Sequence, residues 1–158
     1  MHGGPWALWL PLRLPGLNEL LNSRANIFGS SKGATCRRRR SQLANEYSKL
    51  KKATERDIGI LARAMPPIGR GFWTYLFVEP NRRRDPSNVA SGAVKLIEDA
   101  LQKEGKLEND GWGHVLGIQL YWEVGPRYGV LVAVSEADVL ERSEAIALWR
   151  EAAAGGER

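Results

Sequence analysis

The chain contains little of what disulfide-stapled, zinc-binding or membrane proteins need. It has one cysteine, Cys36, so no disulfide can form within the chain. Its two histidines, His2 and His114, match no zinc-ligand spacing with that cysteine. The apolar run Trp6–Leu10 stops at Pro11 without a preceding basic region, and no other stretch is long and apolar enough to cross a membrane. We therefore expect a cytoplasmic protein in a reducing environment, with no membrane partner.

Size and composition predict one globular domain with local basic surfaces. The chain has 158 residues, of which 43% are hydrophobic and 26% charged, enough for a single core. The net charge is +5, and much of the cationic excess lies in short blocks. These blocks are Arg37, Arg38, Arg39 and Arg40, then Lys49 and Lys52, then Arg82, Arg83 and Arg84. Clustered cations fit a polyanionic partner better than a uniform excess does, and we expect them to contact nucleic-acid phosphates.

The apolar pattern predicts four strands and three helices. Leucines alternate along the first strand, and apolar residues three or four positions apart mark the helices. Aromatic and β-branched residues mark the later strands, and Ser135 is expected to cap the last helix. The elements before that helix are predicted at 6–14, 41–65, 72–78, 87–104, 115–124 and 128–134. The order β-α-β-α-β-β-α indicates an α+β domain, a small mixed β-sheet with flanking helices.

Two segments of the single domain over residues 1–158 are expected to be mobile. Residues 22–40 combine small polar side chains with the four consecutive arginines, which predicts a mobile basic loop. This loop is interpreted either as a phosphate-contacting arm or as an ordinary solvated segment. Residues 153–158 are expected to fray.

Basic and acidic side chains meet around the second predicted helix. Arg82, Arg83 and Arg84 run directly into Asp85 at the start of that helix, and Asp110 lies in the polar turn that follows it. Cations bind phosphate, and Mg²⁺ is usually held by one or two carboxylates plus several waters. The combination predicts a metal-dependent nuclease site, provided that the chain doubles back so that the two aspartates meet.

Each of these acids also has a structural interpretation. Asp85 before a proline is a favoured helix cap, and Asp110 before a glycine is a common turn pair. Asp99 is four residues from a lysine on either side and is expected to pair with one of them. Glu98 is expected to be solvated, and His114 is expected to be a packing or surface residue rather than a catalyst, because no acid is seen close to it in the sequence.

The motifs resemble those of the RusA-like Holliday junction resolvases, small endonucleases often carried by phages and prophages. The resemblance lies in residues 14–19 (LPGLNE), 79–88 (EPNRRRDPSN), 95–101 (KLIEDAL) and 105–110 (GKLEND). It implies a RusA-like nuclease fold and a homodimer that binds four-way branched DNA. It also implies cutting by hydrolysis with Mg²⁺, or Mn²⁺ as a substitute, in DNA recombination and repair.

The resemblance assigns roles position by position. Asp85 and Asp110 match family metal-binding aspartates, Lys95 matches the catalytic lysine, and Asn88 matches the motif asparagine that shares a helical face with Lys95. The arginines at 82–84 match the basic approach to the site.

Two departures reduce the charge of the expected metal site. Ser87 and Asn109 stand where the family has aspartates, and each offers the ion only a neutral oxygen or a contact through its waters. Asp99 and Glu108 are possible substitutes. The alternative function is therefore a non-catalytic protein that binds DNA junctions with an eroded metal site. A weaker alternative is an RNA-binding or RNA-processing module, because backbone contacts alone do not separate DNA from RNA.

Overall fold

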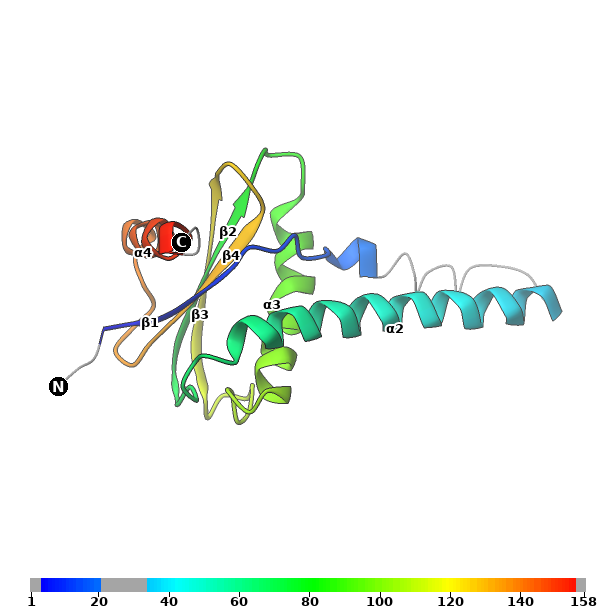
Figure 1. The fold of residues 1–158 in the computed structure, drawn as a ribbon, viewed down its shortest axis with the longest axis horizontal. Coiled ribbons are helices and arrows are strands. Elements are labelled where there is room, and N and C mark those ends of the chain that lie inside the picture. The colour runs from blue at the N-terminus through cyan, green and yellow to red at the C-terminus, as the bar shows by residue number, and fades with distance from the viewer. Residues whose placement is uncertain (1–3, 21–33, 156–158) are drawn as a thin grey trace.

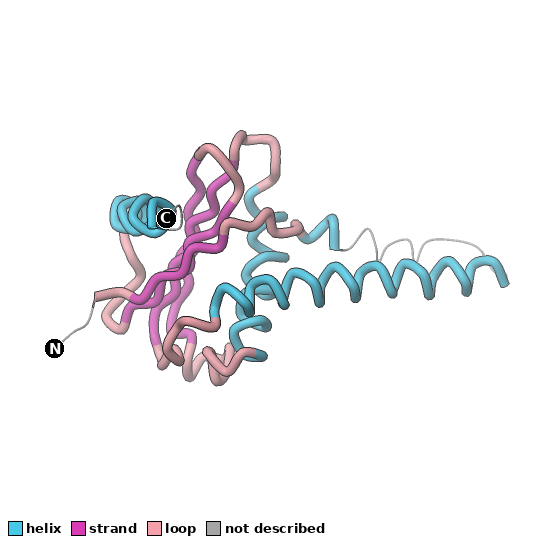
Figure 2. The backbone as a smooth tube through the Cα atoms, in the orientation of Figure 1, coloured by secondary structure: helices cyan, strands magenta, loops and turns pink. Residues whose placement is uncertain are grey.

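A computed structural model describes residues 4–20 and 34–155, with side chains of its long helix from residue 45 onward. It confirms the α+β class: four strands form one mixed sheet, and helices cover both faces (Figures 1 and 2). The elements are β1 Trp6–Leu10, α2 Ala34–Ala62, β2 Gly71–Glu79, α3 Pro86–Lys103, β3 Val115–Val124, β4 Gly129–Ser135 and α4 Arg142–Gly155. Among the described residues, no helix is both long and apolar enough to span a membrane.

The strand order β1-β4-β2-β3 puts β2 and β4 in the middle of the sheet. Strands β2 and β3 are parallel, because α3 returns the chain along the sheet between them. Strand β4 is antiparallel to both β2 and β1. The short connection at Gly125 and Pro126 does not close a hairpin, because β2 lies between the two strands that it joins, β3 and β4.

The central strand β2 is buried on both faces. Tyr75 and Phe77 point into the larger core, where they meet α3 residues such as Ile97. Leu76 points to the other face and packs with Ala145 of α4. Figure 1 shows the matching arrangement, with α4 on one side of the sheet and α2 and α3 on the other. Burying each large apolar side chain contributes roughly 1.5–3 kcal/mol, so both helical layers stabilise the sheet.

The first strand is shorter than predicted. Strand β1 pairs with β4 only as far as Leu10, whose partner is Val130. The predicted strand continued to Leu14. Pro11 has no amide hydrogen for a further ladder bond, which explains the stop. Leu14 is nevertheless buried in the core from the loop that follows.

The helices at each end also differ from the prediction. Helix α2 begins at Ala34, so residues 34–40 of the predicted mobile loop are helical, and residues 22–33 lie outside the described chain. Arginine is a good helix former, and the four arginines continue the helix backward. Helix α4 begins at Arg142 rather than after Ser135, and the Glu144 carboxylate accepts a 2.8 Å bond from the Glu141 amide. It runs to Gly155, so residues 153–155 are helical, while 156–158 lie outside the described chain.

The turn over residues 15–18 docks directly on α3. The Asn18 amide donates a 2.7 Å hydrogen bond to Oδ1 of Asn88. One turn further along the helix, a Cβ on Gly92 would lie 3.0 Å from the Pro15 carbonyl oxygen and 3.0 Å from the Leu17 nitrogen. The motif at 14–19 therefore packs against the helix on which the motif at 79–88 ends, and Gly92 leaves room for this close contact.

We expect Gly92→Ala to destabilise the protein by about 1–2 kcal/mol. Overpacking costs about 1–3 kcal/mol, which outweighs the gain of up to about 1 kcal/mol in helix propensity. Gly59→Ala in α2 is the matched control, because its Cβ would meet only the flexible end of Glu104, at 2.7 Å from Oε1. Urea unfolding should show Gly59→Ala unchanged or stabilised. Equal effects of the two substitutions would contradict this packing.

Candidate functional site

Asp85 acts as the cap of α3. Its Oδ1 accepts hydrogen bonds from the Ser87 amide at 3.0 Å, the Asn88 amide at 3.3 Å and the Ser87 hydroxyl at 2.7 Å. The Ser87 hydroxyl, followed by the Asn88 amide, lowers the pKa of Asp85. Both Asp85 and Ser87 are exposed, but their polar atoms serve each other and the helix end. This matches the structural interpretation of the Asp-Pro pair.

Lys95 joins two acids of the motif. Its Nζ lies 2.9 Å from Oδ1 of Asp99, one helical turn along α3, and also contacts Oδ2 of Asp110. The expected pairing of Asp99 with Lys95 is thus present. Lys51 of α2 adds a second ion pair to Asp99 at 3.1 Å and lies 3.5 Å from Glu55.

The charges in this cluster stabilise one another. The hydrogen bonds that Lys95 donates to Asp110 and then to Asp99 raise the pKa of Lys95, so it stays cationic. The same bond from Lys95 lowers the pKa of Asp110. Burial alone would raise the pKa of Asp99, but the bonds from Lys95 and Lys51 outweigh it and lower that pKa. Both carboxylates are therefore ionised at neutral pH and available to a cation.

Glu98 is buried, which corrects the expectation that it is solvated. It is 7% exposed, and its Oε1 accepts a 3.3 Å hydrogen bond from the Tyr75 hydroxyl of β2. Its position gave a signal: Val94, Ile97 and Leu101 surround it on the apolar stripe of α3. Burial raises the pKa of Glu98, and the charges of Asp110 and Asp99 add to the shift.

Glu98→Gln should stabilise the protein at neutral pH and not at acid pH. Because the folded-state pKa of Glu98 is raised, its contribution to stability is complete below its unfolded pKa, about 4.3. That contribution is lost as pH rises through the folded value. A glutamine stays neutral, so thermal melts of the two proteins should converge near pH 4 and separate as pH rises. A difference in melting temperature that does not depend on pH would contradict the buried acid.

A hollow of about 550 Å³ lies beside this cluster. Its lining includes Glu98, Asp110 and Trp112, together with the start of β3. Trp112 is 94% exposed, which is unusual for so large an apolar ring. The sequence motifs predicted no role for this tryptophan. The hollow therefore gives a ligand access to Asp110, the member of the cluster that lines it.

Asp85 and Asp110 lie at opposite ends of α3 rather than together. Asp85 starts the helix beside the end of β2, whereas Asp110 follows it and precedes β3, which pairs with the start of β2 (Figure 1). Asp99, which shares Lys95 with Asp110, is about 21 Å from Asp85 along the helix axis at about 1.5 Å per residue. Ligands of one Mg²⁺ ion lie within about 4.2 Å of each other, because each is about 2.1 Å from the metal. Within one chain, Asp85 and Asp110 do not share an ion in this structure.

The other proposed metal ligands are also occupied. The Asn109 side-chain oxygen accepts a 2.5 Å hydrogen bond from the Gly111 amide, as in a turn. Glu108 lies 3.3 Å from Nε2 of His114, six residues along the chain. In the described part of the chain, no three His, Cys, Asp or Glu side chains are arranged to hold a metal ion.

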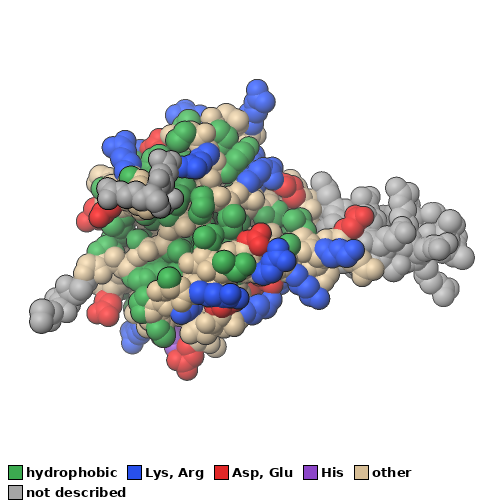
Figure 3. Space-filling model, viewed as in Figure 1, with side chains coloured by type: hydrophobic (Ala, Val, Ile, Leu, Met, Phe, Trp, Pro, Cys, Tyr) green, Lys and Arg blue, Asp and Glu red, His purple; other side chains and the backbone are tan. Residues whose placement is uncertain are grey.

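The basic side chains differ in their exposure to solvent and in whether they have partners. Arg84 is only 14% exposed and is held by Glu79 at 3.1 Å and by the Leu14 carbonyl at 2.5 Å. Arg82, Arg83, Lys49 and Lys52 are exposed, and their side chains have no partner among the described residues. The side chains of Arg37, Arg38, Arg39 and Arg40 lie outside the described residues. On the face seen in Figure 3, lysines and arginines are interspersed with acids rather than gathered into one basic surface.

Comparison with known proteins adds no identification. No protein-family model matches the chain, and no curated protein matches it. The resemblance to the RusA-like resolvases therefore stays a prediction that depends on the motifs.

Proposed function

We propose that the protein is a Mg²⁺-dependent endonuclease of RusA-like type that cuts four-way DNA junctions as a homodimer in the cytoplasm. The observation that carries the proposal is the cluster of Lys95, Asp99 and Asp110 beside a solvent-open hollow. The ordered motifs of the sequence supply the class of reaction. Recombination and repair are the processes in which such junctions arise.

The donor set meets the minimum for magnesium. Asp99 and Asp110 both contact the same ammonium nitrogen, so their oxygens already converge on one cation. Two carboxylates with several waters satisfy Mg²⁺, and Glu98 lines the same hollow as Asp110. When bound, Mg²⁺ would polarise a scissile phosphate and lower the pKa of a water. This assignment replaces Asp85 with Asp99, one of the two substitutes considered from the sequence.

Lys95 is the group best suited to contact the scissile phosphate during hydrolysis. Its side chain is 58% exposed, so it can leave the two carboxylates without disturbing the core. A cation there stabilises the charge that develops on a phosphate during hydrolysis. Lys51 stays on Asp99 and keeps that carboxylate oriented.

DNA binding would come mainly from the free cations. Arg82 and Arg83 extend beside the start of α3, and Lys49 and Lys52 lie on α2. Such phosphate contacts follow the shape of the backbone and weaken with salt. A two-fold dimer would present two copies of these surfaces to a nearly symmetric junction.

One observation favours the alternative, a junction-binding protein that does not cut. The helix holds Asp85 and Asp110 apart, and Lys95 neutralises the acids that do converge. A cluster that is already paired with lysine binds metal less readily than a bare pair of carboxylates.

The test is an incubation with a labelled four-way junction and a matched linear duplex, in Mg²⁺ and in EDTA. Paired, symmetric nicks in the junction alone, absent in EDTA, are the expected result. Tight junction binding without cutting, in Mn²⁺ as well, would support the alternative instead. Equal affinity for junction and duplex would contradict both.

A further inference from the structure

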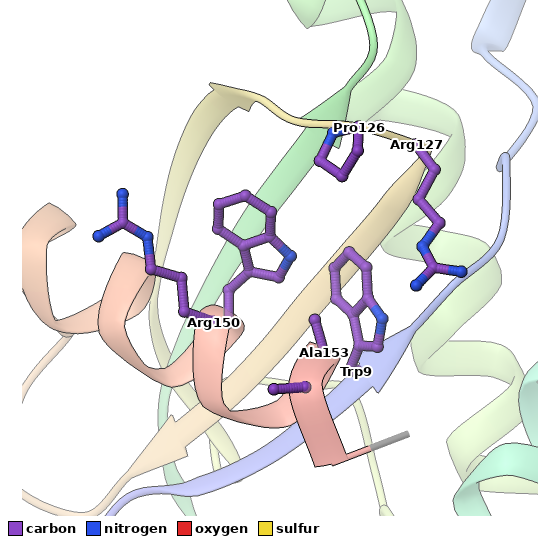
Figure 4. A pocket seen from close by; sticks show the side chains of 7 residues that line it. Trp9, Pro126, Arg127, Arg150 and Ala153 are labelled. Carbon is purple, nitrogen blue, oxygen red and sulfur yellow. The ribbon is translucent and has the colours of Figure 1, made fainter. Parts of the chain in front are cut away.

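Trp112 is the one tryptophan of the chain that is open to solvent. All six tryptophans lie in the described residues, and the other five are buried or half-buried. Trp9 and Trp149, for example, pack against each other between β1 and α4, with ring centroids 6.2 Å apart (Figure 4). Trp112 is 94% exposed, so both faces of its indole ring are open to a ligand. Tryptophan is enriched at binding surfaces, because covering so large a ring is favourable.

Backbone hydrogen bonds hold this ring on a tied turn. The Gly111 carbonyl accepts from the amides of His114 at 2.9 Å and Val115 at 3.0 Å, which closes the turn around Trp112. The Gly71 amide at the start of β2 donates a 2.9 Å bond to the His114 carbonyl. Because the backbone is already ordered, the ring can bind a ligand with little further loss of backbone freedom.

The turn places the ring beside the acid cluster. Asp110 is two residues before Trp112, and both line the same hollow of about 550 Å³. Ile118, which is 47% exposed, lines it as well, so the indole belongs to an apolar border rather than standing alone on the surface. A ligand on the indole therefore lies next to a carboxylate that is proposed to hold the metal.

The acids near the hollow are already paired within the protein. Four of them have partners: Asp99 with Lys51 and Lys95, Asp110 with Lys95, Glu98 with the Tyr75 hydroxyl, and Glu108 with His114. Arg70 is exposed, has no partner among the described residues and precedes Gly71, whose amide holds the turn. This end of the sheet therefore offers a cation to a phosphate beside the ring.

We propose that Trp112 stacks on a base at the branch point of a DNA junction and so makes the protein prefer branched DNA to duplex. This inference rests on the proposed function. Inside a duplex every base is stacked on both faces, so no base offers a face to the indole. At a branch point the stack of base pairs is interrupted, and a base there has one face for the indole to cover. Because every base has a π face, Trp112 recognises the branch and not the sequence.

A protein partner fits this surface less well than a nucleic acid does. A partner that covered Trp112 would also cover Asp110, since both line the hollow, and burying an ionised carboxylate away from water is costly. A base covers the ring and leaves the carboxylate accessible to water and to a cation.

Trp112→Ala tests this inference, with Ile60→Ala as the matched control. Ile60 is a large apolar residue of α2 that is 51% exposed and does not line the hollow. We would measure anisotropy of a labelled four-way junction and a matched duplex in EDTA, with thermal melts to verify folding. Trp112→Ala should weaken junction binding about tenfold or more and change duplex binding less than about twofold, because only the stacking is lost. Trp112→Phe keeps an aromatic face and should retain most of the preference for the junction, and Ile60→Ala should retain all of it.

Equal losses on junction and duplex in Trp112→Ala, or no loss on either, would overturn the inference. Dissociation of a wild-type dimer by Trp112→Ala in sedimentation velocity would also overturn it, because the ring would then pack between subunits. A parallel incubation in Mg²⁺ separates this inference from the nuclease proposal. If the wild type does not cut and Trp112→Ala still loses its preference for the junction, the nuclease proposal fails and the stacking stands. If the wild type cuts and Trp112→Ala binds as the wild type does, the stacking fails and the nuclease stands.

Discussion

Replacing Asp110 by asparagine should abolish junction cutting and leave junction binding within about twofold of wild type. Asp110 supplies one of the two carboxylates that contact Lys95 in the described chain, so its loss removes half of the charge proposed to hold Mg²⁺. Even outer partners of metal ligands cost roughly 10- to 100-fold when removed, so a direct ligand should cost more than about 100-fold. The asparagine oxygen can still accept from Lys95, and the site is partly exposed, so folding should be unaffected.

Asp85→Asn is the matched comparison for that experiment. Asparagine is as good a helix cap as aspartate, so the start of α3 should survive the change. Since Asp85 lies at the other end of the helix, cutting should stay within a few-fold of wild type. Loss of cutting in Asp85→Asn with normal Asp110→Asn activity would contradict the placement of the site. Loss in both would indicate that the partner subunit of a dimer completes it.

Lys95→Ala should separate metal binding from catalysis. Without the ammonium between them, Asp99 and Asp110 repel each other, and a divalent cation relieves this repulsion. Metal affinity should therefore rise by roughly three- to tenfold, since exposed ion pairs contribute up to about 1 kcal/mol. Cutting at saturating Mg²⁺ should fall by about 100-fold or more, because one charge-stabilising group is missing from the phosphate.

Lys51→Ala is the control for the loss of a cation near Asp99. Lys51 pairs with Asp99 and Glu55 but does not contact Asp110. Its removal should leave cutting within about tenfold of wild type, through a less well-oriented Asp99. If Lys95→Ala weakened metal binding, Lys95 would hold Asp99 and Asp110 in position for the metal ion. It would then not compete with the metal ion for these two carboxylates.

The local pattern of the sequence predicted most of the fold. Period-two and period-3.6 patterns identified β2, α3 and β3 within one or two residues, because β2 and one face of α3 are buried in the core and β3 is half-buried beside β2. The ends of helices and strands were less predictable, because one residue or a short run can decide where an element begins or ends. Pro11 ended β1 early, and the arginine run extended α2 where a loop was expected.

The site was harder to predict because it depends on contacts distant in sequence. Asp85 and Asp110 looked like one site, but their separation follows from the direction in which α3 crosses the sheet. Glu98 is buried because Tyr75 of β2 lies opposite it, and Asp99 is held by Lys51 from another helix. None of these pairings leaves a signal at fixed spacing along the chain.

Manganese binding to the free protein tests the central claim most directly. Electron paramagnetic resonance during Mn²⁺ titration reports the bound ion without requiring DNA or cutting. We expect wild-type protein and Asp85→Asn to bind Mn²⁺ equally, and both Asp99→Asn and Asp110→Asn to lose about tenfold or more in affinity. Loss of Mn²⁺ binding in Asp85→Asn, with Asp99→Asn unaffected, would contradict a metal centre at Asp99 and Asp110.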